Sequence, residues 1–212
     1  MHIPDGFIST PIAAAGIAVA AGSVAYAVKA TNKKMGEKQV PLMGVLAAFI
    51  FASQMLNFPI IGGTSGHLLG AALAAIFLGP WAGVLIMTSV LIVQSLIFQD
   101  GGLLALGVNI VNMGIVPCFV GYYVHTGVAW LFHRSKVGLM LGGGLAGWLT
   151  VVASAALCAF ELALSGTVPL KAALPAMTGV YALIGVGEGL ITAAVVALVL
   201  AVRADLLQLQ KA

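Results

Sequence analysis

The sequence predicts an all-α integral membrane protein with seven transmembrane helices, as its composition and its apolar runs indicate. Of the 212 residues, 61% are hydrophobic and only 7% are charged, whereas a soluble domain carries about 25% charged residues. Apolar runs of about 20 residues, each long enough to cross a bilayer as a helix, recur along the chain. The net charge of +3 comes from basic residues beside these runs, so no nucleic-acid partner is expected.

The predicted spans follow one another closely, and the whole chain, residues 1–212, is expected to form one membrane domain. The spans cover residues 9–30, 40–56, 67–78, 81–98, 103–132, 137–164 and 176–202. The third span is short for a full crossing. Gly79 and Pro80 separate it from the fourth, because proline lacks the amide hydrogen and fixes φ.

Basic residues orient these spans. Seven crossings put the two termini on opposite sides, and eight of the nine basic residues lie near the ends of the first and fifth spans or in the C-terminal tail. These eight are Lys29, Lys33, Lys34, Lys38, Arg134, Lys136, Arg203 and Lys211. Since the other side keeps only Lys171, the positive-inside rule places the N-terminus outside and the C-terminus in the cytoplasm. We recognise no secretory signal, so residues 1–8 are expected to remain as an exposed segment outside the cell.

Met1 and His2 form a candidate metal chelate at the chain start. The terminal amine, the backbone nitrogen of His2 and Nδ1 of its ring can close a five- and a six-membered ring on one metal ion. A planar set of nitrogens suits nickel(II) or copper(II), and one corner of the plane stays open for a fourth nitrogen. The alternative interpretation is that His2 follows the first methionine by chance, because so short a motif is weak by itself.

His67 is the candidate for the fourth nitrogen. It follows a glycine-rich stretch in which Thr64 or Ser65 could cap the third helix, so that His67 lies in the first turn of that helix. The predicted topology brings His67 to the same outer face as His2. The alternative interpretation is a polar residue at the membrane interface that binds nothing.

Taken together, the two stretches resemble the NikM/CbiM family: HIPDGF at residues 2–7 and GTSGHLLG at residues 63–70. These proteins are the substrate-binding (S) components of energy-coupling-factor (ECF) transporters for nickel and cobalt in prokaryotic cell membranes. The resemblance implies a six-helix core, residues 40–202, preceded by one extra N-terminal helix, residues 9–30. It also implies that the amine of Met1, the backbone and ring nitrogens of His2, and His67 bind the metal.

The same resemblance indicates the substrate. The run Pro4-Asp5-Gly6 is closer to the nickel branch of the family than to the cobalt branch. The expected substrate is therefore nickel(II), with cobalt(II) as the other candidate, and no cofactor is implied.

The resemblance further implies partners: a transmembrane coupling (T) component, two cytoplasmic ABC-type ATPases and often a small additional membrane subunit. ECF substrate components dock through an alanine face of the first core helix, which corresponds here to Gly44, Ala48 and Ala52. Such small residues let membrane helices approach closely, although Ala14 and Ala18 in the first span form a rival face. The sequence has no G-x-x-x-x-G-K-[ST] loop, so ATP hydrolysis is assigned to the partners, and the chain is not expected to be an enzyme.

Residues behind the metal ligands would orient the histidine rings. Five candidates are chosen by position in the sequence alone: Ser65, Thr64, Gln54, Asn57 and Asp5. For each, a loop or helix-cap role is the competing interpretation.

Glu188 lies near the middle of the last span, where a carboxylate is costly and often functional. The favoured interpretation is that it hydrogen-bonds Asn109, Asn112 or Gln94 and holds helices together. The other is a proton relay, which leads to the alternative function: a stand-alone, proton-coupled secondary metal transporter that uses Glu188 and Glu161.

Overall fold

The computed structural model describes residues 1–34, 36, 39–56, 58–60 and 64–207. Its elements in chain order are α1 (Thr10–Lys34), α2 (Val40–Gln54), β1 (Phe58–Ile60), β2 (Thr64–Gly66), α3 (Ala71–Leu78), α4 (Pro80–Ile97), α5 (Leu106–Ile110), the π-helix η2 (Val111–Ile115), α6 (Val116–Leu131), α7 (Lys136–Leu164), α8 (Leu170–Val202) and the 3-10 helix η3 (Ala204–Leu207). Among the described residues, the regular structure is helical apart from the short antiparallel β1–β2 pair, in which Phe58 lies opposite Gly66. The predicted helical class is confirmed.

Five helices in the described part of the chain are long and apolar enough to cross a membrane. They are α1, α4, the continuous stretch Leu106–Leu131, α7 and α8. The second predicted span is the shorter apolar helix α2, of 15 residues. The third is only the eight-residue α3, most of whose residues are buried. The protein is therefore a multi-pass membrane protein, while the count of seven crossings stays a prediction.

The start of the third span differs from the sequence-based expectation. The helix α3 begins at Ala71 rather than at His67, and Gly70 precedes it with φ 78° and no side-chain cap. Thr64 and Ser65 therefore do not cap this helix, because both belong to β2. The left-handed backbone of Gly70, which glycine adopts without steric cost, turns the extended chain into α3. Asn57 and the side chains of Thr64 and Ser65 lie outside the described residues.

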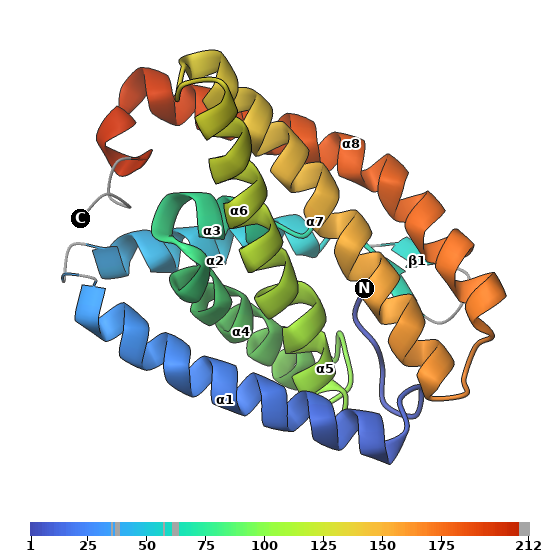
Figure 1. Cartoon of the computed structure of the whole chain (residues 1–212). Helices are drawn as coiled ribbons and strands as arrows, with labels where there is room; N and C mark the ends of the chain where they lie inside the picture. Colours follow the sequence, from blue (N-terminus) through green and yellow to red (C-terminus); the bar gives the residue numbers. More distant parts are fainter. Residues whose placement is uncertain (35, 37–38, 57, 61–63, 208–212) are drawn as a thin grey trace.

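The first three residues are buried among the helices, so the expectation of an exposed segment over residues 1–8 is wrong for them, whereas Asp5 and Gly6 are exposed. Figure 1 shows the N-terminus inside the molecule, with the chain running from there to the start of α1. Met1 and Ile3 are 0% exposed and His2 is 3% exposed. The apolar side chains of Met1 and Ile3 join the hydrophobic core, and burying them is favourable.

The long helices have their ends at two sides of the bundle. The start of α1 and the turn between α7 and α8 lie at one side, whereas the end of α1, the turn between α6 and α7 and the end of α8 lie at the other (Figure 1). At the first side, the hydroxyl of Thr167 donates to the backbone oxygen of Phe7. This contact ties the segment before α1 to the turn that precedes α8.

Candidate metal site

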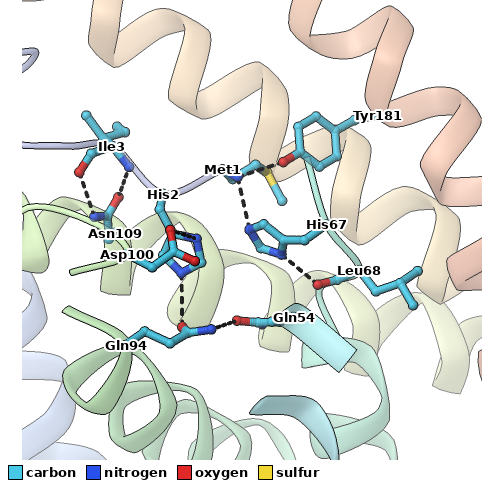
Figure 2. Close-up of polar contacts among 10 residues, drawn as sticks. All are labelled: Met1, His2, Ile3, Gln54, His67, Leu68, Gln94, Asp100, Asn109 and Tyr181. Carbon is cyan, nitrogen blue, oxygen red and sulfur yellow. Dashed lines mark hydrogen bonds and ion pairs between the residues drawn. The ribbon is translucent and has the colours of Figure 1, made fainter. Parts of the chain in front are cut away.

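Met1, His2 and His67 come together in the interior, close to the position where α3 begins. The amine nitrogen of Met1 lies 3.0 Å from Nε2 of His67, and the two imidazole centroids are 4.7 Å apart. His67 is 1% exposed. Figure 2 shows the chain start and the two rings facing one another. The structure thus brings together the three residues that the sequence analysis named as metal ligands.

Side-chain and backbone contacts hold the chain start in a fixed register. The backbone nitrogen of Ile3 donates to Oδ1 of Asn109 at 2.9 Å, and Nδ2 of Asn109 donates to the oxygen of Ile3 at 3.1 Å. The nitrogen of Gly102 donates to the same oxygen at 2.9 Å. Because Ile3 is held at both its polar groups, the two residues before it are placed at a defined distance from His67.

Asp5, two residues after Ile3, anchors the same segment. Its carboxylate accepts hydrogen bonds from the backbone nitrogens just before α5, namely those of Leu103, Leu104 and Ala105. These three amides belong to the turn that leads into α5 (Leu106–Ile110), so the carboxylate holds that turn against the N-terminal segment. Asp5 therefore fixes the entry of the N-terminal segment, and the structure records no contact between its side chain and either ring.

The ring of His67 is held in one tautomer. Its Nδ1 lies 2.7 Å from the oxygen of Leu68, and a carbonyl can only accept, so Nδ1 carries the hydrogen. The Nε2 atom then bears a lone pair and accepts a hydrogen bond from the Met1 amine. A ring whose far nitrogen donates to a carbonyl is oriented as metal-binding histidines usually are.

The ring of His2 is fixed by a directional chain of amides. Nε2 of Gln54 donates to the oxygen of Leu69 at 2.6 Å, so its Oε1 accepts from Nε2 of Gln94 at 2.9 Å. Oε1 of Gln94 is then the acceptor for Nε2–H of His2 at 3.0 Å (Figure 2). In the neutral ring this order leaves Nδ1 of His2 as the lone-pair nitrogen, which is the nitrogen that the six-membered chelate ring requires, and Asp100 pairs with Nδ1 only when that nitrogen is protonated.

Burial keeps these nitrogens unprotonated near neutral pH. Desolvation lowers the pKa of the Met1 amine to about 5. Desolvation, followed by the nearby terminal amine, lowers the pKa of His2 to about 4, and the same two causes hold the pKa of His67 well below its ordinary value. Since a metal binds a lone pair and not an N–H⁺ group, the site presents its donors in the form that binds.

Two further polar groups face the chain start. The hydroxyl of Tyr181 accepts a hydrogen bond from the Met1 amine at 2.7 Å, and a carboxylate oxygen of Asp100 lies 3.3 Å from Nδ1 of His2. Within the described ranges, no three side chains of His, Cys, Asp or Glu gather as a metal site would need.

Gln94, Asn109 and Tyr181 were not proposed as part of the site from the sequence. Amides and hydroxyls buried in apolar spans are unusual in a membrane protein, and that signal could have singled them out. Gln54 was proposed, and it belongs to the chain of amides behind His2.

Glu188 does not bond the side chains suggested from the sequence. Its two oxygens accept hydrogen bonds from the backbone nitrogens of Leu69 and Gly70. Glu161 of α7 accepts a hydrogen bond from Nδ2 of Asn112. Glu188 therefore joins α8 to the segment that carries His67 rather than to other transmembrane side chains.

Comparison with known proteins identifies the family of this chain. The family described as CbiM, cobalt uptake substrate-specific transmembrane region, matches residues 2–206. The chain belongs to the CbiM family. A protein of Archaeoglobus fulgidus, provisionally named a fused nickel transport protein NikMN, is 44% identical over 214 residues, which are 100% of this chain and 69% of that protein.

Other members of the CbiM family carry cobalt names. The cobalt transport protein CbiM of Geobacter sulfurreducens is 33% identical over 217 residues, which cover 98% of this chain and 61% of that protein. A solved structure described as a transition metal transporter is 35% identical, with a TM-score of 0.82 over 97% of this chain and 93% of that one. The family is thus one of metal transport proteins.

Proposed function

We propose that this CbiM-family chain captures nickel(II) at the outer face of a prokaryotic cell membrane as the substrate-binding component of an ATP-driven ECF importer. The observation that carries the proposal is the contact between the Met1 amine and Nε2 of His67, 3.0 Å apart. Met1, His2 and His67 are the proposed ligands, through the amine, the backbone nitrogen and Nδ1 of His2, and Nε2 of His67.

The spacing of these nitrogens suits a planar complex. Two donors at right angles, each about 2.0–2.1 Å from a metal, lie about 2.8–3.0 Å apart, which matches the distance from Met1 to His67. In the chelate, the metal lies between these two nitrogens, and the neutral amine turns its lone pair toward it and keeps its hydrogens. Nitrogen donors in a plane favour nickel(II), whereas zinc prefers a tetrahedral set and magnesium and calcium prefer oxygen.

The site also suits the charge of the ion. Coordination by the backbone nitrogen of His2 removes its proton, so a divalent ion keeps one positive charge in a buried setting. The carboxylate of Asp100, 3.3 Å from Nδ1 of His2, can offset that charge. The family names nickel in some relatives and cobalt in others, so cobalt(II) is the second candidate substrate.

The proposed assembly follows the ECF pattern: a T component, two cytoplasmic ABC-type ATPases and often a small additional membrane subunit. For the T component we propose a docking face formed by Gly44, Ala48 and Ala52. All three residues are exposed on α2, on the side away from Leu46 and Ile50, which are buried. Ala14 and Ala18 on α1 are exposed as well, so exposure alone does not decide between the two faces.

Metal analysis tests the substrate. The purified full chain is exposed to an equimolar mixture of nickel, cobalt, zinc and magnesium, washed, and its metal content measured. The proposal expects about one nickel per chain and little zinc or magnesium. Zinc in place of nickel, or no bound metal, would overturn it.

Uptake in membrane vesicles separates the importer from the proton-coupled alternative that uses Glu188 and Glu161. The importer requires ATP and the partner subunits. Transport by this chain alone under a pH gradient would favour the alternative. Against that alternative, both carboxylate oxygens of Glu188 are engaged by backbone amides, which leaves the carboxylate poorly placed to pass a proton onward.

A further inference from the structure

Glu188 contacts the segment that follows His67 directly. Its Oε2 accepts from the nitrogen of Leu69 at 2.9 Å, and its Oε1 accepts from the nitrogen of Gly70 at 2.6 Å. The residue is only 3% exposed. A carboxylate inside a membrane helix is costly unless polar groups satisfy it. Here two successive peptide N–H groups do so, in the manner of the backbone concavities that bind anions.

Gly70 lies where the chain turns from the segment of His67 into α3. Its φ of 78° lies in the left-handed region, so the two amides that Glu188 accepts from stand directly before the helix. A Cβ atom added at Gly70 would lie 2.8 Å from Cγ1 of Ile50. Glycine is thus required both by the backbone conformation and by the close approach of α2.

Close packing of α7 against α8 fixes the backbone of Glu188. A Cβ atom at Gly189 would lie 2.6 Å from the oxygen of Gly144, and one at Gly185 would lie 2.9 Å from Cδ1 of Trp148. Helices α7 and α8 therefore approach closely on both sides of Glu188, with backbone against backbone at Gly189, as small residues permit in membranes. Figure 1 shows the two helices side by side.

We infer that Glu188 is a positioning residue for metal binding, which holds residues 67–70 so that Nε2 of His67 faces the Met1 amine. The inference rests on the proposed metal site. The same short segment supplies the oxygen of Leu68 that orients His67 and the oxygen of Leu69 that begins the chain of amides to His2. The carboxylate of Glu188 thus positions the backbone segment whose carbonyl oxygens orient the rings of His67 and His2.

Helix α8 contacts the site a second time. Tyr181, which accepts from the Met1 amine, precedes Glu188 by seven positions, so the two side chains lie two turns apart on one face of the helix. Through Tyr181 and Glu188, α8 holds the chain start and the segment of His67 at a fixed separation.

The test compares nickel affinity in the purified full chain before and after Glu188→Gln. Glutamine keeps the size but replaces one acceptor oxygen by an NH₂ group that faces a peptide N–H. We expect nickel binding to weaken at least tenfold, and the absorption spectrum of bound nickel to move toward that of His67→Ala. Glu161→Gln on α7 is the matched control, since it makes the same change at a half-buried carboxylate that contacts Asn112, and it should keep native affinity.

A double-mutant cycle separates positioning from general stability. If Glu188 acts through His67, Glu188→Gln and His67→Ala should weaken nickel binding by less than the product of their separate effects. Glu188→Asp keeps the charge but shortens the side chain, so it should give an intermediate nickel affinity. This variant also allows the test to be made if Glu188→Gln fails to fold. Native affinity in Glu188→Gln, or effects that multiply fully, would overturn the inference. If the wild-type chain itself bound no nickel, the proposed function would fail instead.

Discussion

The amine of Met1 and Nε2 of His67 lie 3.0 Å apart although 66 positions separate the two residues in the sequence. The contact exists because Asn109 holds Ile3 at both of its backbone polar groups, while Glu188 and Gln54 hold the segment after His67. The two partners thus arrive from separate parts of the chain, each positioned by its own set of buried hydrogen bonds.

His67→Ala should remove one nitrogen donor while leaving the chain start in place. We expect nickel binding to weaken at least tenfold, which corresponds to about 1.4 kcal/mol, with no loss of folded protein. Isothermal titration calorimetry of the purified variant measures the change. His133→Asn is the control, because His133 is exposed and its φ of 50° suits asparagine. Full nickel occupancy in His67→Ala would show that His67 is not a ligand.

Gln94→Met should impair the site without touching any proposed ligand. Methionine has a similar length but cannot accept the hydrogen of Nε2 of His2, so the ring loses the contact that fixes its tautomer. Loss of such a supporting contact typically costs about 10–100-fold in metal affinity. Equilibrium titration with nickel gives the ratio, and Gln39→Met near the start of α2 serves as the control. Equal affinity in both variants would mean that the amide chain does not orient His2.

Proton release reports whether the backbone nitrogen of His2 coordinates the metal. With the pKa of the amine near 5 and that of His2 near 4, both groups are neutral at pH 7, so nickel should displace about one proton, that of the amide. Affinity should then fall about tenfold per pH unit as the pH falls from 7, and more steeply below pH 5, where the amine takes up a proton. Calorimetry in buffers of different ionisation enthalpy counts the protons. A count of zero would exclude amide coordination.

Much of this arrangement could be predicted from the sequence. The apolar runs predicted the long helices, and the spacing of Met1 and His2 from the chain start predicted a chelate. The burial of the N-terminal segment was not predicted, because exposure was inferred from its position before the first span. Ile3 and Met1 instead join the core, and Asn109 pairs the backbone of Ile3, which only the three-dimensional structure reveals.

The start of α3 shows another limit of pattern reasoning. A threonine or serine ahead of an apolar run is typical of a helix cap, but Gly70 in the left-handed region begins the helix four residues later than His67 suggests. The extended segment places His67 against Met1, and a first-turn position would have pointed the ring differently. The contact of Glu188 with Leu69 and Gly70 was equally invisible, since the partners are backbone amides and leave no mark in the sequence.

Ala48→Leu should separate metal capture from transport. Ala48 is exposed on α2, so a leucine there should fit the isolated protein and leave nickel affinity unchanged. If α2 docks on the T component, the larger side chain should hold the partner helix away and reduce co-purification and ATP-dependent nickel uptake. Ala18→Leu on α1 is the matched control. A defect confined to Ala18→Leu would move the docking face to α1.

We propose that the terminal amine and the backbone nitrogen of His2 bind the metal, which requires a fixed distance from the chain start. Insertion of one alanine between Met1 and His2 displaces the amine from its five-membered ring, while Asn109 still holds Ile3. Because Met1 is buried, size-exclusion chromatography and intact mass must first show that the variant is folded and begins with Met-Ala-His. An alanine inserted after the exposed Gly36 controls for the effect of insertion.

The decisive measurement is the nickel dissociation constant of this N-terminal insertion variant beside that of the wild type. We predict that the insertion weakens nickel binding at least a hundredfold and changes the absorption spectrum of the bound ion, while the control after Gly36 binds as the wild type does. An insertion variant that keeps its added residue and binds nickel with the native dissociation constant and spectrum would contradict the terminal chelate.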